Sequence, residues 1–185
     1  MKKGLLIVLG VVVILGLWMG SGYNKLVSYS EAVPAAWSQV ETVLQRRYDL
    51  IPNLVNTVKG YAKHEKDLLT EVTRLRSQWG EAKSQGQKIE AANGLETALN
   101  RLMVVVEQYP QLKANENFIR LQDELAGTEN RISVERMRYN ETVNAYNVTV
   151  RRFPSNILAG LFGFEKSQKY FEGDKAAQQA PQVQF

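Results

Sequence analysis

Few residue types in this chain could do chemistry, and their spacing suits neither a catalytic nor a metal site. His64 is the only histidine, so no second histidine can share a metal ion with it. Cysteine is absent, which excludes disulfides, thiolate metal ligands, cysteine nucleophiles and a lipidated cysteine. A carboxylate di-metal site in a helical bundle needs Glu-x-x-His pairs on facing helices, and the chain has none. We therefore expect no catalytic residue, no metal ligand and no cofactor.

Serine nucleophiles and phosphate-binding loops are missing in the same way. No G-x-S-x-G turn occurs, and the stretch from Gly80 to Gly86 predicts a small polar turn rather than a loop that cradles phosphate. A hydrolase remains an alternative only if carboxylates from separate helices converge in a pocket. The net charge of +4 is modest and basic residues alternate with acidic ones, so nucleic acid is not an expected partner.

Three charged residues, Arg47, Glu65 and Glu135, occupy positions of a three-four pattern where an apolar side chain is expected. A buried charge without a partner is costly. These residues should therefore pair with one another or with neighbouring arginines, or else lie at the edge of the pattern with their charged ends in water. In either arrangement they would set the register between helices.

The pattern itself predicts long amphipathic helices. Residues three and four apart are mostly apolar or aromatic from Trp37 to Trp79 and again from Asn117 to Phe153, with a shorter helix expected over 89–107. Pro52 does not disturb this spacing, which favours a kink in a continuous helix over a tight turn. Either Pro52 or Pro110 is expected to reverse the chain. The predicted fold is all-α, an antiparallel up-and-down bundle of three to four long, kinked helices.

Several stretches resemble the LemA family of bacterial membrane-anchored helical proteins. The resemblance rests on Y-N-K-L-V at 23–27, W-S-Q-V-E at 37–41, Q-R-R-Y-D-L-I-P-N-L-V at 45–55, V-K-G-Y-A-K-H-E at 58–65, T-E-N-R-I at 128–132 and R-Y-N-E-T-V-N-A-Y-N at 138–147. These stretches cover nearly the whole chain in order. The resemblance implies a membrane-anchored bundle without an agreed biochemical activity, and one branch of the family is associated with forming magnetosome membranes.

Two Tyr-Asn pairs, Tyr139-Asn140 and Tyr146-Asn147, are seven residues apart and therefore share one helical face. We interpret the tyrosines as core residues and the asparagines as polar contacts between helices, in preference to a ligand site.

The N-terminus is set apart by a run from Gly4 to Gly20 without a charged residue. About 17 to 20 helical residues reach across a hydrocarbon core of roughly 30 Å. Residues 1–22 are therefore expected to be a single transmembrane anchor, in preference to a cleaved signal peptide, because Gly20-Ser21-Gly22 is a weak cleavage site. Lys2 and Lys3 precede the span, which predicts a cytoplasmic N-terminus and an extracytoplasmic bundle at a bacterial inner membrane.

The remaining chain is expected to form a bundle over 23–172 and a disordered tail over 173–185. Near its end, an apolar segment from Asn156 to Phe164 follows Pro154. Its interaction candidates are Ile157, Leu161 and Phe162. The segment either covers the open end of the bundle, which we favour, or lies in the membrane interface, because it is too short to span.

The predicted function is a non-enzymatic, membrane-anchored scaffold that organises or shapes the bacterial cell envelope. It would do so as a homo-oligomer or by binding a protein partner whose identity the sequence does not give. The alternative is an accessory subunit of a membrane peptidase or signalling system.

Overall fold

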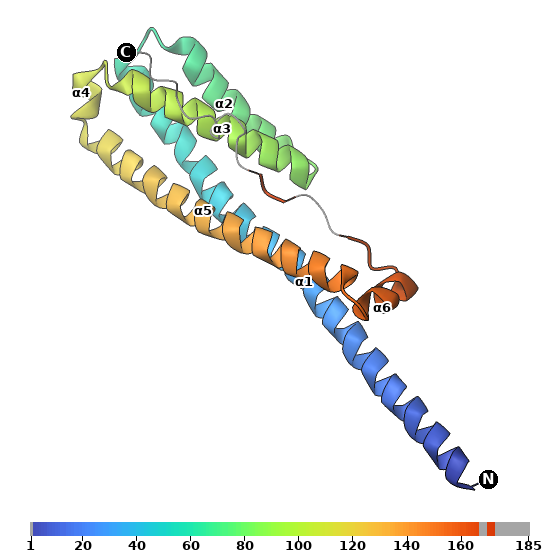
Figure 1. Cartoon of the computed structure of the whole chain (residues 1–185). Helices are drawn as coiled ribbons and strands as arrows, with labels where there is room; N and C mark the ends of the chain where they lie inside the picture. The colour runs from blue at the N-terminus through green and yellow to red at the C-terminus, as the bar shows by residue number, and fades with distance from the viewer. Residues whose placement is uncertain (1, 167–169, 173–185) are drawn as a thin grey trace, which may run out of the picture. The chain divides into compact units, whose positions relative to one another are not determined.

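The computed structural model of this protein describes residues 2–166 and 170–172, and over these residues it contains helices and no strand (Figure 1). The helices follow in the order α1 (Lys2–Tyr61), α2 (Lys66–Glu81), α3 (Gln85–Val106), α4 (Pro110–Lys113), α5 (Glu116–Arg151) and α6 (Ser155–Phe162). The prediction of an all-α helical bundle is therefore confirmed. The expected disordered tail over 173–185 lies outside the described residues.

The chain forms two compact units. Unit 1 comprises Met1–Gln39 and Met137–Tyr170, and unit 2 comprises Val40–Arg136 and Phe171–Phe185. Both α1 and α5 contribute residues to each unit, whereas α2, α3 and α4 belong to unit 2 and α6 belongs to unit 1. Helix α1 continues without a break past residue 22.

Helix α1 is uninterrupted over 60 residues and passes through both Pro34 and Pro52. The interpretation of Pro52 as part of a continuous helix is correct, and Pro52 therefore does not reverse the chain. Its ring removes one backbone hydrogen bond, but the adjacent side chains of Ile51 and Leu54 are fully buried. Burial of two such side chains offsets the proline penalty of roughly 3 kcal/mol, since each contributes about 1.5–3 kcal/mol.

The first reversal of the chain lies at residues 62–65, between α1 and α2. The expected continuous helix up to Trp79 is therefore wrong, and Pro110 lies in a later connection, at the first residue of α4. Charged side chains stabilise the two helix ends that flank this turn. Lys59 lies in the last turn of α1 and Asp67 in the first turn of α2. Cations stabilise a helix C-terminus and anions an N-terminus through the helix dipole.

The core of unit 2 is built from one apolar face of each long helix. The expected apolar positions are buried there, namely Leu44, Ile51, Leu54, Val58, Leu68, Val72, Leu75, Leu99, Leu102, Leu125 and Ile132. Tyr61 is an exception, because its side chain is exposed at the end of α1. The three-four pattern thus predicted the buried face of each helix correctly even where it missed a helix end.

Tyr48 and Trp79 join α1 to α2 in unit 2. Their rings stack with centroids 4.4 Å apart and an interplanar angle of 18°. Burial raises the pKa of the Tyr48 hydroxyl far above its usual value, so this group stays neutral in the core.

Side-chain caps stabilise the first turns of α3 and α5. Ser84 and Gln87 form a capping box at the start of α3, which narrows the predicted Gly80–Gly86 turn to residues 82–84. Asn115 caps α5, because its Oδ1 accepts a hydrogen bond of 3.1 Å from the backbone N–H of Phe118.

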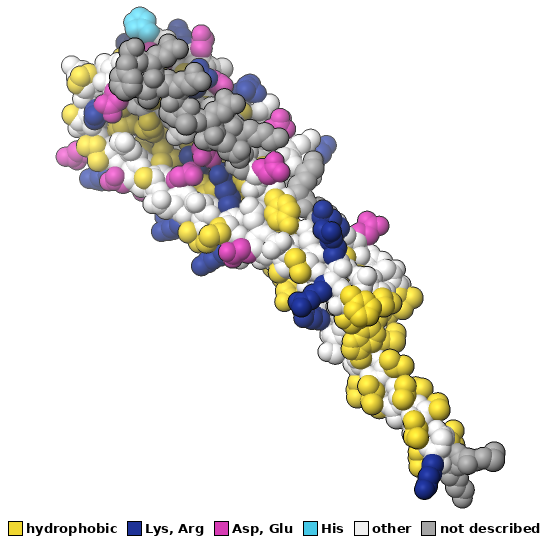
Figure 2. Space-filling model, viewed as in Figure 1, with side chains coloured by type: hydrophobic (Ala, Val, Ile, Leu, Met, Phe, Trp, Pro, Cys, Tyr) yellow, Lys and Arg dark blue, Asp and Glu magenta, His cyan; other side chains and the backbone are white. Residues whose placement is uncertain are grey.

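No residue in the apolar N-terminal part of α1 is buried by the described part of the chain. Among the described residues, α1 is the one helix long and apolar enough to cross a membrane, with a mean hydropathy of 2.4 in its most apolar window and none of that window buried. Figure 2 shows hydrophobic side chains covering this part of the helix. Such a surface is stable in lipid and not in water.

Candidate functional site

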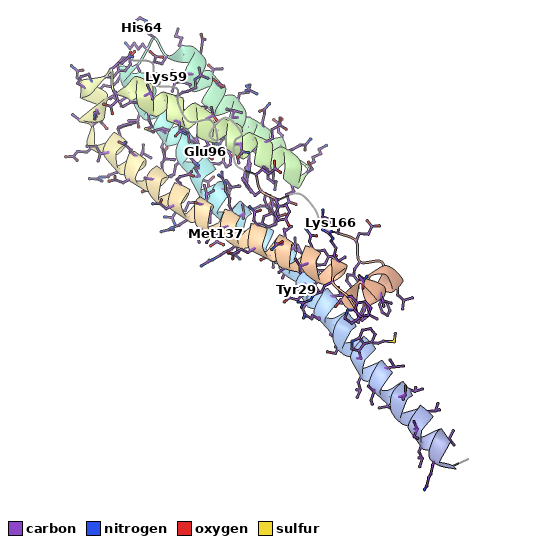
Figure 3. All side chains as sticks on the ribbon, viewed as in Figure 1. Tyr29, Lys59, His64, Glu96, Met137 and Lys166 are labelled. Carbon is purple, nitrogen blue, oxygen red and sulfur yellow. The ribbon has the colours of Figure 1, made fainter. Side chains whose placement is uncertain are left out.

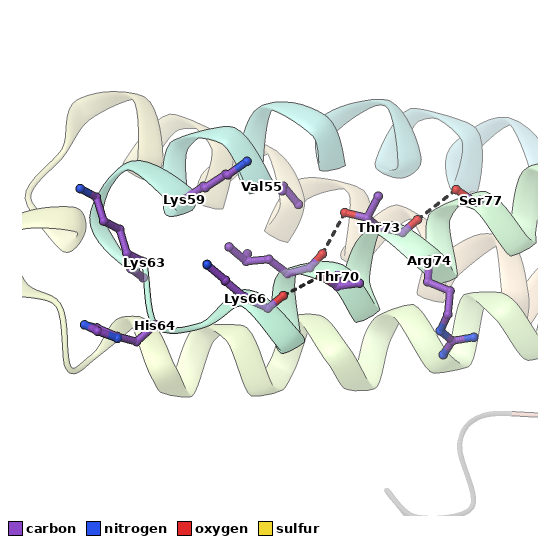
Figure 4. Close-up of a pocket in the computed structure, with 11 residues that line it drawn as sticks. Val55, Lys59, Lys63, His64, Lys66, Thr70, Thr73, Arg74 and Ser77 are labelled. Atoms are coloured by element: carbon purple, nitrogen blue, oxygen red, sulfur yellow. Dashed lines mark hydrogen bonds between the residues drawn. The ribbon is translucent and has the colours of Figure 1, made fainter.

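A groove of about 1160 Å³ lies in unit 2 between the end of α1 and α2 (Figure 4). Its floor includes Val55, Ala62 and Leu69, of which Ala62 and Leu69 are buried. This apolar floor exists because the chain reverses at residues 62–65, which brings the last turns of α1 beside the first turns of α2.

The rim of the groove is cationic. Figure 4 shows basic side chains from α1, the turn and α2 around it, namely Lys59, Lys63, His64, Lys66 and Arg74. No Asp or Glu is among the described residues that line the groove. An apolar floor with a positive rim suits an amphipathic helix whose polar edge is acidic.

Threonine hydroxyl groups in the groove donate hydrogen bonds to backbone carbonyl oxygens of α2. Thr70 donates to the carbonyl oxygen of Lys66 at 2.7 Å, and Thr73 donates to that of Leu69 at 2.8 Å. Neither hydroxyl is paired with a base, as a nucleophile would require. Over residues 2–166 and 170–172, no group of three or more His, Asp or Glu side chains is placed to hold a metal ion. The described groove thus combines an apolar floor with basic side chains at its rim.

Arg47 is the most buried of the charged residues that the sequence singled out. Its Nη1 donates to Oε2 of Glu129 on α5, and the side chains of Arg47 and Glu129 are 7% and 36% exposed. Sequence reasoning missed Glu129 because the pairing depends on the register between α1 and α5. The only available signal was its place beside Thr128, a residue of the three-four pattern.

Glu65 and Glu135 are the other two charged residues of the three-four pattern. Glu65 belongs to the turn between α1 and α2, where it accepts a hydrogen bond of 3.0 Å from the hydroxyl of Tyr109. This hydrogen bond raises the pKa of Tyr109. Glu135 is half-buried on α5, and Pro52 is half-buried on α1.

The aromatic members of the expected interaction set lie in unit 1. Tyr139 is buried with its ring edge-on to half-buried Trp37, at a centroid distance of 5.5 Å. Tyr146 is buried, and its hydroxyl donates to the carbonyl oxygen of Glu165 at 2.8 Å. These residues tie α1, α5 and the segment after α6 together.

The two asparagines have different surroundings. Asn140 is half-buried. Asn147 is 4% exposed, and neither its amide oxygen nor its amide nitrogen has a hydrogen-bond partner in the described part of the chain. Asn147 therefore does not make the polar contact between helices that the sequence predicts.

Helix α6 covers unit 1 with only part of its apolar surface. Leu158 and Ala159 are buried, and Leu158 contacts Gly22 of α1, where a larger residue would collide with it. The three candidates from the sequence remain exposed, with Ile157 at 55%, Leu161 at 66% and Phe162 at 46%. Within the apolar segment, Leu158 packs against α1 as the preferred covering account expects, whereas Ile157 and Leu161 keep more than half of their surface exposed.

Comparisons with known proteins identify relatives of this chain. Residues 36–185 match the LemA family. Magnetosome proteins MamQ 1 and MamQ 2 of Paramagnetospirillum magneticum are each 31% identical over 185 residues, which cover 86% of this chain and 67% of theirs. Protein LemA of Metamycoplasma hominis is 23% identical over 137 residues, which cover 74% of this chain and 63% of that protein. This chain thus spans about two thirds of the length of these relatives.

Neither the family nor the names of these relatives denotes an enzyme. Because the family match extends over most of the sequence and includes the helices of both units, this protein belongs to the LemA family.

Proposed function

We propose that this protein is a non-enzymatic, membrane-anchored scaffold that assembles with copies of itself to organise or shape a bacterial membrane. The observation that carries the proposal is the apolar, cation-rimmed groove between α1 and α2. The candidate span in α1 supports a membrane location. The magnetosome proteins among the relatives support a role in organising a membrane.

The occupant that we propose for the groove is the first part of α5 of a second copy. Glu116, Ile119 and Asp123 follow one another at spacings of three and four and therefore share a face. Ile119 is 43% exposed, so this face offers one apolar side chain between two carboxylates. Glu116 contacts Arg120 at 3.7 Å, but both are well exposed, and such pairs contribute little.

The dimensions of the two surfaces also agree. The groove follows α2 from Lys66 to Ser77, about 16 Å of helix, and the acidic face of α5 extends for about 10 Å. We propose that this contact is made head to tail, in which case repeated contacts build rings or filaments, whereas reciprocal contact would close a two-fold dimer. Such an assembly would provide an extended scaffold along a membrane.

Charge reversal tests this assembly in the full chain, solubilised in detergent. Lys63→Glu with Lys66→Glu should weaken self-association at least tenfold, because two attractive pairs become repulsive and about 1.4 kcal/mol corresponds to tenfold. Adding Glu116→Lys and Asp123→Lys to the same chain should restore assembly. Light scattering or mass photometry over a concentration series measures the change.

The matched control is Lys83→Glu with Arg131→Glu, which reverses two exposed cations outside the groove and should leave association unchanged. A wild-type chain that stays monomeric would reject self-assembly and favour the accessory-subunit alternative. Loss of assembly that the acidic-face reversal fails to restore would reject α5 as the occupant.

We further propose that the N-terminus is cytoplasmic and that unit 2 lies outside the cytoplasm at the inner membrane, because Lys2 and Lys3 precede the span. The chain has no cysteine, so Lys83→Cys provides a single reporter on an exposed turn and leaves the capping residue Ser84 intact. A membrane-impermeant thiol reagent should label it in cells whose outer layers, where present, are permeable. Labelling only after the inner membrane is broken would reverse the topology.

A further inference from the structure

We propose that unit 1 binds the phosphate group of an anionic phospholipid in a basic groove at the end of α5. This proposal concerns a different surface from the self-assembly groove and does not depend on it. The lipid groove has a volume of about 360 Å³. Its described lining residues are Asn144, Asn147, Val148, Arg151, Arg152, Lys166 and Tyr170.

The buried amide of Asn147 is the first argument for a ligand. A buried polar group without a hydrogen-bond partner is destabilising, and native proteins seldom leave both ends of an amide unpaired. The amide nitrogen of Asn147 can donate two hydrogen bonds, and a phosphate oxygen can accept them. Asn147 is a lining residue of the lipid groove, so a phosphate there would supply the missing acceptor for its amide nitrogen.

The charge of the lipid groove is the second argument. Arg151 follows Asn147 by four residues and therefore lies one turn along the same face of α5. Arg152 and Lys166 add two further cations, and none of the described lining residues is acidic. Figure 3 shows Lys166 on the segment after α6, alongside the end of α5. A single arginine can bind a phosphate group through two parallel hydrogen bonds. Phosphate therefore fits this groove better than other anions do.

The position of α6 identifies the source of the phosphate as a lipid. Leu158 contacts Gly22, and the ring of Phe162 is edge-on to Tyr23 at 4.8 Å, so α6 lies just beyond the apolar segment that ends at Gly20. Tyr23 lies three residues beyond Gly20, which is about 4.5 Å along the helix. The headgroup layer is about 5–7 Å thick on each side of a bilayer, so Tyr23 and the ring of Phe162 lie within it.

The exposed apolar side chains of α6 support the same source. Ile157, Leu161 and Phe162 continue the apolar surface of the span, and Figure 2 shows hydrophobic side chains gathered around this part of unit 1. Short amphipathic helices bury such side chains at the boundary between headgroups and acyl chains. Arg151 and Arg152 precede α6 by only a few residues, so the basic groove opens at the level of the headgroups.

Lipid retention by the full chain in detergent tests the phosphate site. Native mass spectrometry after incubation with equal amounts of phosphatidylglycerol and phosphatidylcholine should show preferential retention of phosphatidylglycerol. Arg151→Gln with Arg152→Gln should lower this preference about tenfold or more, because each basic residue near a lipid surface contributes about fivefold. Asn147→Leu should also lower it without loss of thermal stability, because leucine removes the unpaired amide at similar volume.

The control for the lipid site is Arg120→Gln with Arg131→Gln, two exposed arginines on α5 outside the lipid groove, which should retain the wild-type preference. An unchanged preference in the Arg151 and Arg152 variant would overturn the proposal. Complete displacement of phosphatidylglycerol by inorganic phosphate would also overturn it, because the site would then bind a free anion.

A depth measurement tests the position of α6. In vesicles of phosphatidylcholine and phosphatidylglycerol, an environment-sensitive fluorophore on Leu161→Cys should be quenched by brominated lipids. The same fluorophore on Gln39→Cys should not be quenched, because Gln39 lies about 28 Å beyond Gly20 along α1. Equal quenching at the two positions, or none at Leu161, would place α6 away from the interface and reject the lipid source.

Discussion

Replacing Leu54 by alanine should lower the free energy of unfolding by about 2 to 5 kcal/mol, the largest effect that we expect from a single apolar substitution in this chain. Leu54 is 0% exposed and lies in α1 two residues after Pro52, where burial supports a helix weakened by proline. The substitution removes buried apolar surface and leaves a cavity that rigid neighbouring helices fill only partly. Urea unfolding of the full chain in detergent, followed by fluorescence, measures the loss.

Val104→Ala is the matched control for Leu54→Ala. Val104 is an apolar helical residue of unit 2 whose side chain is 69% exposed, so its truncation should cost less than about 0.5 kcal/mol. Similar losses in the two variants would show that the buried face of α1 is assigned incorrectly.

The Arg47–Glu129 pair should respond unequally to removal of its two members. Glu129→Ala should cost about 3 kcal/mol, because it leaves the guanidinium of Arg47, 7% exposed, buried without its partner. Arg47→Met should cost less than about 1 kcal/mol, because methionine replaces the buried stem and Glu129, 36% exposed, keeps access to water. A double-mutant cycle measured by the same unfolding experiment separates the pair energy from the cost of the orphaned charge.

An exposed ion pair provides the comparison for this cycle. Arg101 and Glu71 are 3.0 Å apart with side chains 61% and 37% exposed, so Glu71→Ala should cost less than about 0.5 kcal/mol. If Glu129→Ala lowers the free energy of unfolding no more than Glu71→Ala does, the explanation by burial is wrong. It is also wrong if Glu129→Ala and Arg47→Met lower it equally.

The sequence predicted the buried faces of the helices because that information is local. An apolar side chain every three or four residues marks the same face of α1 whether or not the partner helix is known. Leu54 and Val58 were therefore assigned correctly to the core. The ends of the helices were harder to predict than their buried faces. The three-four spacing continues through the turn at residues 62–65, and no glycine or proline lies within that turn.

Missing that turn also concealed the candidate site. A helix that continued through residues 62–65 would carry Lys59 and Lys66 along one rod, whereas the reversal brings them to the same groove from α1 and α2. The partner of Arg47 was missed for a related reason, because Glu129 reaches it only through the register between α1 and α5. Local periodicity specifies faces, but convergence of distant side chains depends on where the chain turns.

The contact of α6 with α1 has a consequence for biosynthesis. Tyr23 leaves the ribosome early, whereas Phe162, which covers one side of its ring, is made near the end of the described chain. At 5–20 residues per second, roughly 7 to 28 seconds separate their synthesis. Throughout that interval the part of α1 around Tyr23 has no α6 beside it. This surface of α1 therefore stays uncovered by the chain's own α6 until translation is nearly complete.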